Sequence, residues 1–391
     1  MRTFSFIYRH VKWLCYFPGM PRSTRPRANV STLAEVAAAA GVSVATASRA
    51  LGGYGSVRSD TADRVAEVAR TLRYSRNGLA RSIVTGRTHT LGAVVADIEN
   101  PFFASAMRAF SDVAGKAASQ VLLANTDEDA DTERAAVEML LQRRVDGMLV
   151  VPASPMEIDH LRAVQSGGTP LVLLDRTLAG LTVDSVVIDN VLAGRMAAAP
   201  LLSAGHRRIA MVTSAERDDP AGPRANPGLG RILGFRQALR AAGIDDGDAV
   251  AHAVDFRVTS AEERTLELLS GPRPPTALVT TDSSMTLGAI RAARRLGLRV
   301  PHDVSLVGID DADWMPVLVP PITVVAQPAA QLGAHAASLL LRRLAEPEAP
   351  PVVRTLPVTM IMRGSVAPPG AARPSNGTLV WAPPRPDVPQ S

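Results

Sequence analysis

Hydrophobic and polar positions follow two different periods along the chain. Between Ser31 and Tyr74, an alanine-rich segment, apolar residues recur at helical spacing. From Thr90 to about Ser365, short β-branched runs alternate with amphipathic stretches. This change of period predicts a small all-α domain followed by a larger α/β region with buried parallel sheets.

The candidate strands of the α/β region are near-continuous apolar runs, as expected when helices cover both faces of a parallel sheet. They are Leu91–Ala96, Val121–Ala124, Gly147–Val151, Leu171–Leu174, Ser185–Ile188, Arg208–Val212, Ala277–Thr280 and Val304–Ile309. Amphipathic helices are predicted between several of them, for example over Glu133–Arg143 and Met285–Leu296.

The first helix of the small domain is predicted to begin after Thr32, because Thr32 and Glu35 have the spacing of a capping box. Gly41 stands where the chain must turn sharply, and glycine adopts the left-handed conformation at low cost. Ser43 can cap a second helix that runs to Leu51. A third helix over Ser59–Leu72, capped by Ser59, would complete a small core.

Helix, glycine turn and second helix match the helix-turn-helix, whose second helix enters the DNA major groove. An αα-hairpin from a helical bundle is the alternative. On the second helix, Ala47 and Leu51 are predicted to face inward. The residues left outside are Val44, Ala45, Thr46, Ser48 and Arg49.

Charge supports this interpretation without requiring it. The 391-residue chain carries a formal charge of +5, and its first quarter is rich in arginine, which can bind phosphates and guanine edges bidentately.

Its single cysteine, Cys15, excludes a disulfide within the chain and a cysteine-rich zinc site. Arg9, His10 and Lys12 interrupt the apolar N-terminal run, and no run is long enough for a bilayer, so we expect a cytoplasmic protein.

Several ordered motifs resemble the lactose/galactose repressor family, and the resemblance covers roughly Ser31–Ser365. The motifs are Leu33–Ala37, Ala40–Ser43, Thr46–Arg49, Arg70–Tyr74, Arg87–Thr88, Asn100–Phe103, Arg144–Gly147, Asp189–Asn190, Gly205–Ile209, Gly308–Asp311 and Gln327–Pro328. The resemblance implies a helix-turn-helix headpiece, a hinge and a two-lobed core like that of type I periplasmic binding proteins.

In that family, the residues matching Val44, Ala45 and Arg49 project toward base edges. A hinge helix pairs with its partner in the minor groove, where the residue matching Ile83 wedges between base pairs. An inert linker is the alternative. The predicted DNA contacts are Thr32, Ser43, Val44, Ala45, Thr46, Ser48, Arg49, Asn77, Leu79, Ala80 and Ile83.

Polar and aromatic residues follow the candidate strands at their carboxyl ends, where open α/β sheets bind ligands. In sugar-binding relatives of this family, most of the matching positions contact the ligand. Purine-responsive relatives differ at the pair that matches Asp175 and Arg176, so the resemblance favours a sugar over a purine. Helix capping by the carboxylates and core packing by the phenylalanines are the alternatives. The predicted effector contacts are Asp97, Asn100, Phe102, Phe103, Asp175, Arg176, Arg231, Phe256, Asp282, Asp310 and Gln327.

The domain order follows from these assignments. We expect a disordered or wrongly assigned N-terminal extension (1–30), the headpiece (31–75), the hinge (76–89), the core (90–365) and a disordered proline-rich tail (366–391). The predicted partners are pseudo-palindromic double-stranded operator DNA, a sugar effector and a second copy in a homodimer. No cofactor or metal is predicted, and the missing nucleotide-binding and hydrolase motifs argue against an enzyme. A secreted sugar-binding protein is the other alternative.

Overall fold

The computed structural model describes residues 31–52, 55–74, 87–214, 226–245, 249–253, 255 and 257–370. Contacts divide the chain into Met1–Gly86 and Arg87–Ser391, which we call the headpiece unit and the core unit and describe separately. The predicted hinge contacts and one predicted effector contact lie outside the described residues. These are Asn77, Leu79, Ala80, Ile83 and Phe256.

The headpiece unit contains three short helices around an alanine- and valine-rich core. The helices are α1 (Leu33–Ala39), α2 (Val44–Gly52) and α3 (Ser59–Thr71). The buried core residues are Val36, Ala37, Ala40, Ala47, Val65 and Ala69. Small side chains let the helices approach closely, so this unit forms a core from few residues.

Most of the predicted helix boundaries of the headpiece are confirmed. Thr32 and Glu35 form both hydrogen bonds of the capping box, and the Ser43 hydroxyl accepts from Thr46 N at 3.1 Å. Gly41 is left-handed, with φ of 65°. The cap predicted at Ser59 is wrong, because Arg58 holds the N-cap position and α3 already includes Ser59. The carbonyl of Arg58 accepts from Ala62 N at 2.9 Å, which starts the helix one residue earlier.

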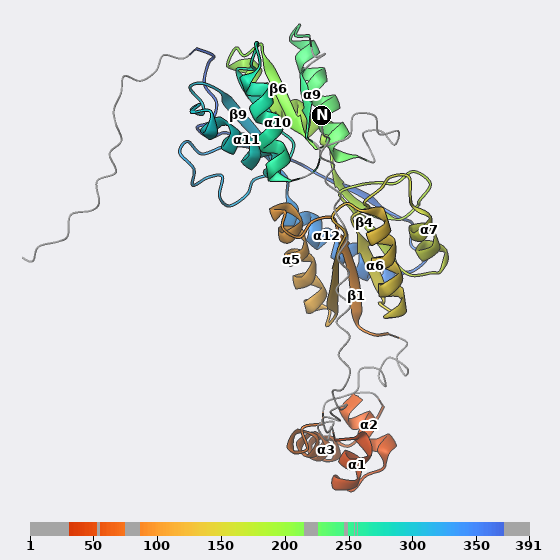
Figure 1. The fold of residues 1–391 in the computed structure, drawn as a ribbon. Helices are drawn as coiled ribbons and strands as arrows, with labels where there is room; N and C mark the ends of the chain where they lie inside the picture. Colours follow the sequence, from red (N-terminus) through yellow and green to blue (C-terminus); the bar gives the residue numbers. More distant parts are fainter. Residues whose placement is uncertain are drawn as a thin grey trace, which may run out of the picture. The chain divides into compact units, whose positions relative to one another are not determined.

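The core unit has two lobes, each built on a six-stranded sheet (Figure 1). The sheet of lobe 1 has the order β11-β5-β4-β3-β1-β2, with parallel pairing throughout. Its elements are β1 (Thr90–Val95), α5 (Pro101–Lys116), β2 (Gln120–Asn125), α6 (Ala130–Gln142), β3 (Gly147–Val150), α7 (Asp159–Ser166), β4 (Leu171–Leu174) and β5 (Asp184–Ile188).

The sheet of lobe 2 has the order β12-β10-β9-β8-β6-β7. Its elements are α8 (Asn190–Ser203), β6 (Ile209–Thr213), α9 (Pro227–Ala241), β7 (Val250–His252), α10 (Val258–Ser270), β8 (Ala277–Thr280), α11 (Ser283–Arg295), β9 (Ser305–Ile309) and β10 (Thr323–Ala326). The chain ends with α12 (Ala329–Ala345), β11 (Val353–Leu356) and β12 (Thr359–Ile361).

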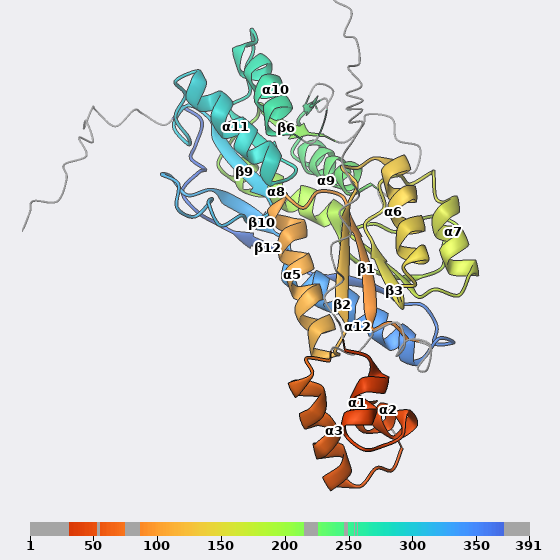
Figure 2. The same cartoon turned by 60° about the horizontal axis from the view of Figure 1, so that its bottom comes forward.

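The chain crosses between the lobes three times. After β5 of lobe 1, helix α8 packs on α9 of lobe 2, and after β10 of lobe 2, helix α12 packs on α5 of lobe 1 (Figure 2). Strand β11 then joins lobe 1 beside β5, and β12 joins lobe 2 beside β10. Each lobe is therefore completed by segments that lie far away in the sequence.

The predicted strands are all present, with boundaries within a residue or two. Two expectations about the sheets need correction. Strand β2 lies at a sheet edge, where Leu122 and Leu123 are 40% and 46% exposed, so helices do not cover both of its faces. The pair β10–β12 is antiparallel, and β7, β10, β11 and β12 were not among the predicted strands, although β10 is also a short buried apolar run.

The C-terminal segment continues beyond Ser365 along lobe 2. Val366 packs against the core, and Ala367 O accepts from His206 Nε2 at 2.8 Å and from Ser305 Oγ at 3.1 Å. Burial lowers the pKa of His206, so the neutral ring fits this buried hydrogen-bonded position. His206 thus joins the start of β6 to the end of the described chain.

Candidate functional site

The outer face of α2, the second helix of the headpiece, has few long polar side chains. Val44, Ala45 and Arg49 are exposed, and Val44 is 49% accessible. Thr46 and Ser48 are half-buried, and the Thr46 hydroxyl lies 2.9 Å from that of Ser43 at the start of the helix. Arg49 therefore has the only long polar side chain among the residues that the sequence placed on this face.

Two side-chain bonds hold the headpiece turns in place. Arg64 Nε of α3 donates to Ala40 O at 3.1 Å, at the turn before α2. The Ser31 hydroxyl donates to Leu72 O at 2.7 Å, which ties the start of the unit to the end of α3. Because Arg64 of α3 holds the turn before α2, this hydrogen bond helps to keep α2 in its orientation relative to α1 and α3.

The predicted effector contacts of the core unit come together. One cavity between the lobes, called the cleft cavity below, is lined by every predicted effector contact that the structure describes. They are Asp97, Asn100, Phe102, Phe103, Asp175, Arg176, Arg231, Asp282, Asp310 and Gln327. The sequence did not predict the further lining residues Glu128, Thr213, Ser214, Asn226, Pro227, Gly228 and Thr281 as contacts.

Each lobe contributes an aspartate directly after a buried strand. Asp175 follows β4 and Asp310 follows β9, and both have left-handed backbones, with φ of 70° and 76°. Their backbone N–H groups donate to the neighbouring strands, at Val186 O and Val325 O. A left-handed residue that is not glycine is uncommon, and such residues are concentrated at functional sites.

A helix N-terminus of each lobe also faces the cleft cavity. Asn100 caps α5 and Asn226 caps α9, each by accepting a backbone hydrogen bond, and proline follows both. The repeated asparagine–proline pair was visible in the sequence and would have indicated Asn226. The helix-cap alternative for the carboxylates is confirmed for Asp282, which caps α11 while also lining the cavity.

Two aromatic rings form the apolar part of the cavity wall. Phe102 and Phe103 begin α5, and their rings pack edge to face with centroids 5.0 Å apart. Both are more than nine-tenths buried and belong to the main core cluster. The core-packing alternative therefore holds for these rings as well, since the same side chains fill the core and border the cavity.

Arg176 is held by a carboxylate that the sequence did not indicate. Its Nη2 donates to both oxygens of Glu128 at 2.8 and 2.9 Å, and its Nη1 donates to Pro152 O at 2.5 Å. Burial alone would lower the pKa of Arg176, but Glu128, Asp175 and Glu133 together raise it. Glu128 reaches this position through a turn in which Asp127 and Glu128 are both left-handed.

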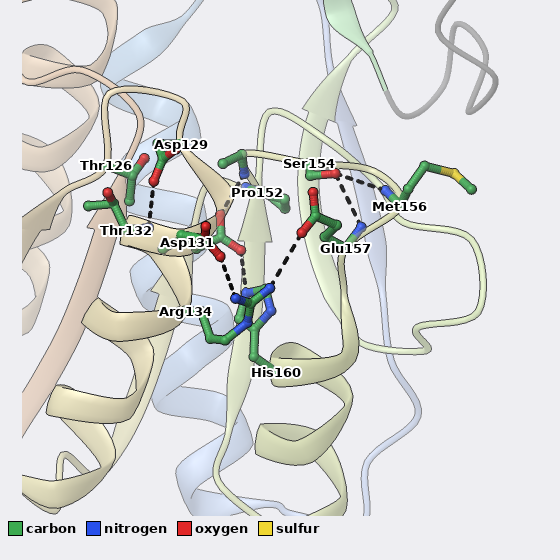
Figure 3. Close-up of polar contacts among 12 residues, drawn as sticks. Thr126, Asp129, Asp131, Thr132, Arg134, Pro152, Ser154, Met156, Glu157 and His160 are labelled. Carbon is green, nitrogen blue, oxygen red and sulfur yellow. Dashed lines mark hydrogen bonds and ion pairs between the residues drawn. The ribbon is translucent and has the colours of Figure 1, made fainter.

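The loop behind Arg176 is anchored by a buried pair. Glu133 of α6 accepts from Ala153 N at 2.5 Å and from His160 Nε2, 2.6 Å away on α7. Arg134 on the same helix forms ion pairs with Asp131 and Glu157 (Figure 3). Because Pro152 O contacts Arg176, this network fixes the loop that positions the guanidinium in the cavity.

Lobe 2 holds its own arginine in a similar way. Arg231 Nε donates to Asn190 Oδ1 at 2.9 Å, and Nη1 donates to Thr281 O at 2.5 Å. Gln327 Nε2 donates to Asp310 at 2.6 Å. Burial raises the pKa of Asp310 to about 6, although Arg231 and Gln327 oppose the shift. Burial also raises the pKa of Asp282.

Among the described residues that line this cavity, three polar atoms are buried without a hydrogen-bond partner. They are Asp175 Oδ1, Arg176 Nε and Gln327 Oε1. An unsatisfied buried polar group costs about 1–3 kcal/mol. Their convergence from both lobes suits a ligand with several hydroxyl groups, which can donate to the two acceptors and accept from the donor.

Comparison with known proteins decides the family. Residues 32–77 match bacterial regulatory proteins, lacI family, and residues 198–366 match a periplasmic binding protein-like domain. The HTH-type transcriptional regulator DegA of Bacillus subtilis (strain 168) is 32% identical over 78% of this chain and 89% of DegA. The HTH-type transcriptional repressor CytR of Escherichia coli (strain K12) is 31% identical over 86% of this chain and 96% of CytR. The chain belongs to the lacI family of bacterial regulatory proteins.

Two solved structures of transcription regulators resemble this one in both sequence and fold. A complex of the transcriptional regulator CelR with cellobiose has a TM-score of 0.64 and 30% identity, covering 86% of this chain and 99% of that one. A LacI family regulator from Enterococcus faecium with bound ribose has a TM-score of 0.63 and 30% identity, covering 71% and 99%. The lacI family assignment establishes a DNA-binding transcription regulator. No helix among the described residues has the length and apolarity to cross a membrane.

Proposed function

We propose that this lacI family member is a repressor whose operator affinity is controlled by a sugar bound in the cleft cavity. One observation carries the effector part of the proposal. Asp175, Arg176 and Gln327 each leave a buried polar atom without a partner at the same cavity, beside the rings of Phe102 and Phe103.

The chemistry of the wall supports a polyol. Carboxylate and amide oxygens accept hydroxyl protons, and guanidinium groups donate in a fixed plane. Phenyl rings can cover the apolar face of a sugar ring. Two similar solved structures, a transcription regulator with cellobiose and a LacI family transcription regulator with ribose, add support for a sugar. The proposed effector contacts are the predicted contacts that line the cleft cavity, together with Phe256.

For the DNA side, we propose Arg49 as the main base reader. Val44 and Ala45 offer apolar contacts, for example to a thymine methyl group, whereas arginine can read guanine bidentately. The remaining DNA contacts proposed are Thr32, Ser43, Thr46 and Ser48 in the headpiece and Asn77, Leu79, Ala80 and Ile83 in the hinge. Such binding would take place in the cytoplasm.

A homodimer is proposed as the DNA-binding form. Two headpieces would read the two halves of a pseudo-palindromic operator. Strand β2 supports this assembly, because it is a sheet edge that exposes Leu122 and Leu123. An exposed apolar edge strand is a surface that proteins usually cover or protect with charge.

The proposal is tested with the purified full chain. Duplexes that it retains from a random pool would be sequenced, and their common motif would be used in a fluorescence anisotropy titration. We expect a two-fold symmetric motif, and we expect one sugar of a mono- and disaccharide panel to change the operator affinity. A chain that selects no motif would overturn the DNA part. If no sugar changes operator affinity, the effector part is wrong.

We also infer that the chain binds its effector without turning it over. The curated relatives described above are named as transcription regulators. Incubation of the protein with the bound sugar should return that sugar unchanged by mass spectrometry and NMR. A released product would contradict the inference.

A further inference from the structure

The two interlobe cavities contain more negative than positive groups. In the cleft cavity, the carboxylates of Asp97, Glu128, Asp175, Asp282 and Asp310 face the guanidinium groups of Arg176 and Arg231. A second cavity adjoins it, shares Asp97 and Glu128, and adds three more carboxylates and one more arginine. These are Glu99, Asp127, Asp255 and Arg257.

Ion pairs within the protein do not neutralise this excess. Among the described residues, Glu128 is the only carboxylate of the cleft cavity with a cationic nitrogen within 4.0 Å, and its partner is Arg176. The other arginine of the cavity, Arg231, uses Nε and Nη1 on the amide oxygen of Asn190 and the carbonyl of Thr281. Asp97, Asp175, Asp282 and Asp310 therefore form no ion pair within 4.0 Å in the described part of the chain, and Arg231 attracts Asp282 and Asp310 only from farther away.

A second, independent observation points to a ligand that donates hydrogen bonds. Asp175 is 8% exposed, and its Oδ1 is buried without a partner at the cavity. Gln327 Oε1, another acceptor, is also buried without a partner, while Arg176 Nε is the only such donor among the described residues that line this cavity. Unmet acceptors outnumber unmet donors here. Each hydroxyl of a neutral polyol adds one donor and two acceptor lone pairs, whereas an ammonium group adds three donors and no acceptor.

The aromatic wall is compatible with a cation as well. Phe102 and Phe103 border the cavity, and an aromatic face attracts a cation by about 0.5–1 kcal/mol at exposed sites and more when water is excluded. Burial raises the pKa of both Asp310 and Asp282, and the attraction of each carboxylate to Arg231 offsets only part of this shift.

We propose that the effector is a cationic polyol of the amino sugar class, with its ammonium group facing the surplus carboxylates of the cleft. This inference rests on the proposed control by a sugar and narrows it to one chemical class. The hydroxyl groups would meet the arginine and amide groups, and the ammonium group would supply the charge that the cavity lacks.

Isothermal titration calorimetry of the full chain at about pH 7 tests the class of ligand. The probes are D-glucosamine, D-galactosamine and D-mannosamine, each compared with its neutral parent D-glucose, D-galactose or D-mannose. D-ribose and cellobiose are added as neutral sugars of other sizes. We expect at least one amino sugar to bind roughly tenfold or more tightly than its parent, which is a difference of about 1.4 kcal/mol.

A matched pair of variants tests whether the cleft charge is the cause. Asp97→Asn removes one carboxylate, and its remaining Oδ1 can still accept the bond that Glu99 N donates at 2.8 Å. Asp112→Asn removes the same charge from the exposed face of α5, where Asp112 pairs with Arg108. We expect Asp97→Asn to reduce the preference for the amino sugar several-fold and Asp112→Asn to leave it unchanged.

The outcomes separate the two levels of the proposal. If a neutral sugar binds as tightly as its amino counterpart, or if ribose or cellobiose binds and no amino sugar does, the inference is wrong and control by a sugar survives. If none of the probes binds, the inference fails together with the proposed sugar effector. If Asp97→Asn and Asp112→Asn change the preference for the amino sugar equally, the carboxylates of the cleft are not its cause.

Discussion

Asp310 shows how one buried carboxylate of the cleft cavity lowers folding stability. It is 6% exposed and left-handed, and burial raises its pKa to about 6 from 3.8. Between these values the folded state holds a proton that the unfolded chain has released, so folding stability falls as the pH rises through this window. The difference corresponds to at most roughly 3 kcal/mol at neutral pH.

Replacing Asp310 by Asn should therefore stabilise the ligand-free protein. Asparagine tolerates the left-handed backbone and can still accept from Gln327, while it removes the buried charge. We expect a gain of about 1–3 kcal/mol at neutral pH, which shrinks as the pH falls toward 4, together with weaker effector binding. Urea unfolding across a pH series measures the gain.

Asp311→Asn is the matched control for this prediction. Asp311 is the next residue, and it holds Arg363 through two hydrogen bonds of 2.7 Å, which raise the pKa of that guanidinium. Its loss should destabilise the protein slightly or leave it unchanged. If Asp310→Asn also fails to stabilise the protein at neutral pH, the ionised carboxylate of Asp310 does not lower the free energy of unfolding.

Arg49→Ala should reduce sequence discrimination more than overall DNA affinity. The side chain is exposed on α2, so its removal leaves the headpiece core intact. The expected loss of preference for the operator over a scrambled duplex is about 1–3 kcal/mol. Arg70→Ala, which removes the same charge from the exposed side of α3, should preserve that preference. An equal loss of preference in both variants would count against direct reading by Arg49.

The residues of the cleft differ in how well the sequence predicts them. Asp175 and Asp310 directly follow apolar strands, so their place at the cavity follows from the strand pattern alone. Glu128 was missed because its position depends on two consecutive left-handed residues and on the reach of Arg176 from another strand. Asn226 was missed although its asparagine–proline pair repeats that of Asn100.

At the scale of elements, the cleft depends on how closely α8 and α9 pack. A Cβ atom on Gly194 would lie 1.9 Å from Arg231 O, and one on Gly234 would lie 1.9 Å from Val191 O. These are backbone atoms, which cannot move aside like the end of a side chain. The two glycines thus set the distance between the helix that starts at Asn190 and the helix that carries Arg231.

Gly194→Ala should therefore push α9 away and displace Arg231 from the cavity. We expect a loss of about 1–3 kcal/mol in folding stability, as for overpacked cores, and a clear loss of effector affinity. Gly115→Ala is the matched control, because Gly115 lies in α5 and a Cβ there meets nothing within 4 Å. The control should gain up to about 1 kcal/mol. Unchanged stability and binding in Gly194→Ala would contradict the close-packing argument.

The sequence predicts the regular elements of the lobes better than their edges. Strands such as β4 and β8 were predicted with the boundaries that the structure has, because buried parallel strands are short apolar runs with sharp ends. The exposure of β2 could not be predicted, since an apolar run does not reveal whether a neighbouring strand lies on both sides. Strands β11 and β12 contain polar residues and pair only with distant strands, so no local pattern marks them.

At the scale of the whole molecule, the apolar edge of β2 should be part of the dimer contact. Leu123→Glu places a charge on an edge strand without removing a core side chain, because Leu123 is 46% exposed. We expect dimer dissociation to become roughly tenfold easier or more in sedimentation velocity experiments. Glu138→Gln, on an exposed position of α6, is the control. A dimer of unchanged affinity in Leu123→Glu would place the contact elsewhere.

Control of DNA binding by the cleft requires that the coupling be reciprocal. If the effector changes the operator affinity by some factor, the operator must change the effector affinity by the same factor. The lobes are suited to such coupling because three crossings join them, so a ligand that contacts both can bias their relative position. We expect the factor by which saturating operator changes the effector affinity to equal the factor by which saturating effector changes the operator affinity. Titrations of each ligand with and without the other measure both factors. A scrambled duplex that the wild-type chain does not bind should have no influence on effector affinity. An effector that binds the wild-type chain equally well with and without operator would show that the cleft and the headpiece act independently.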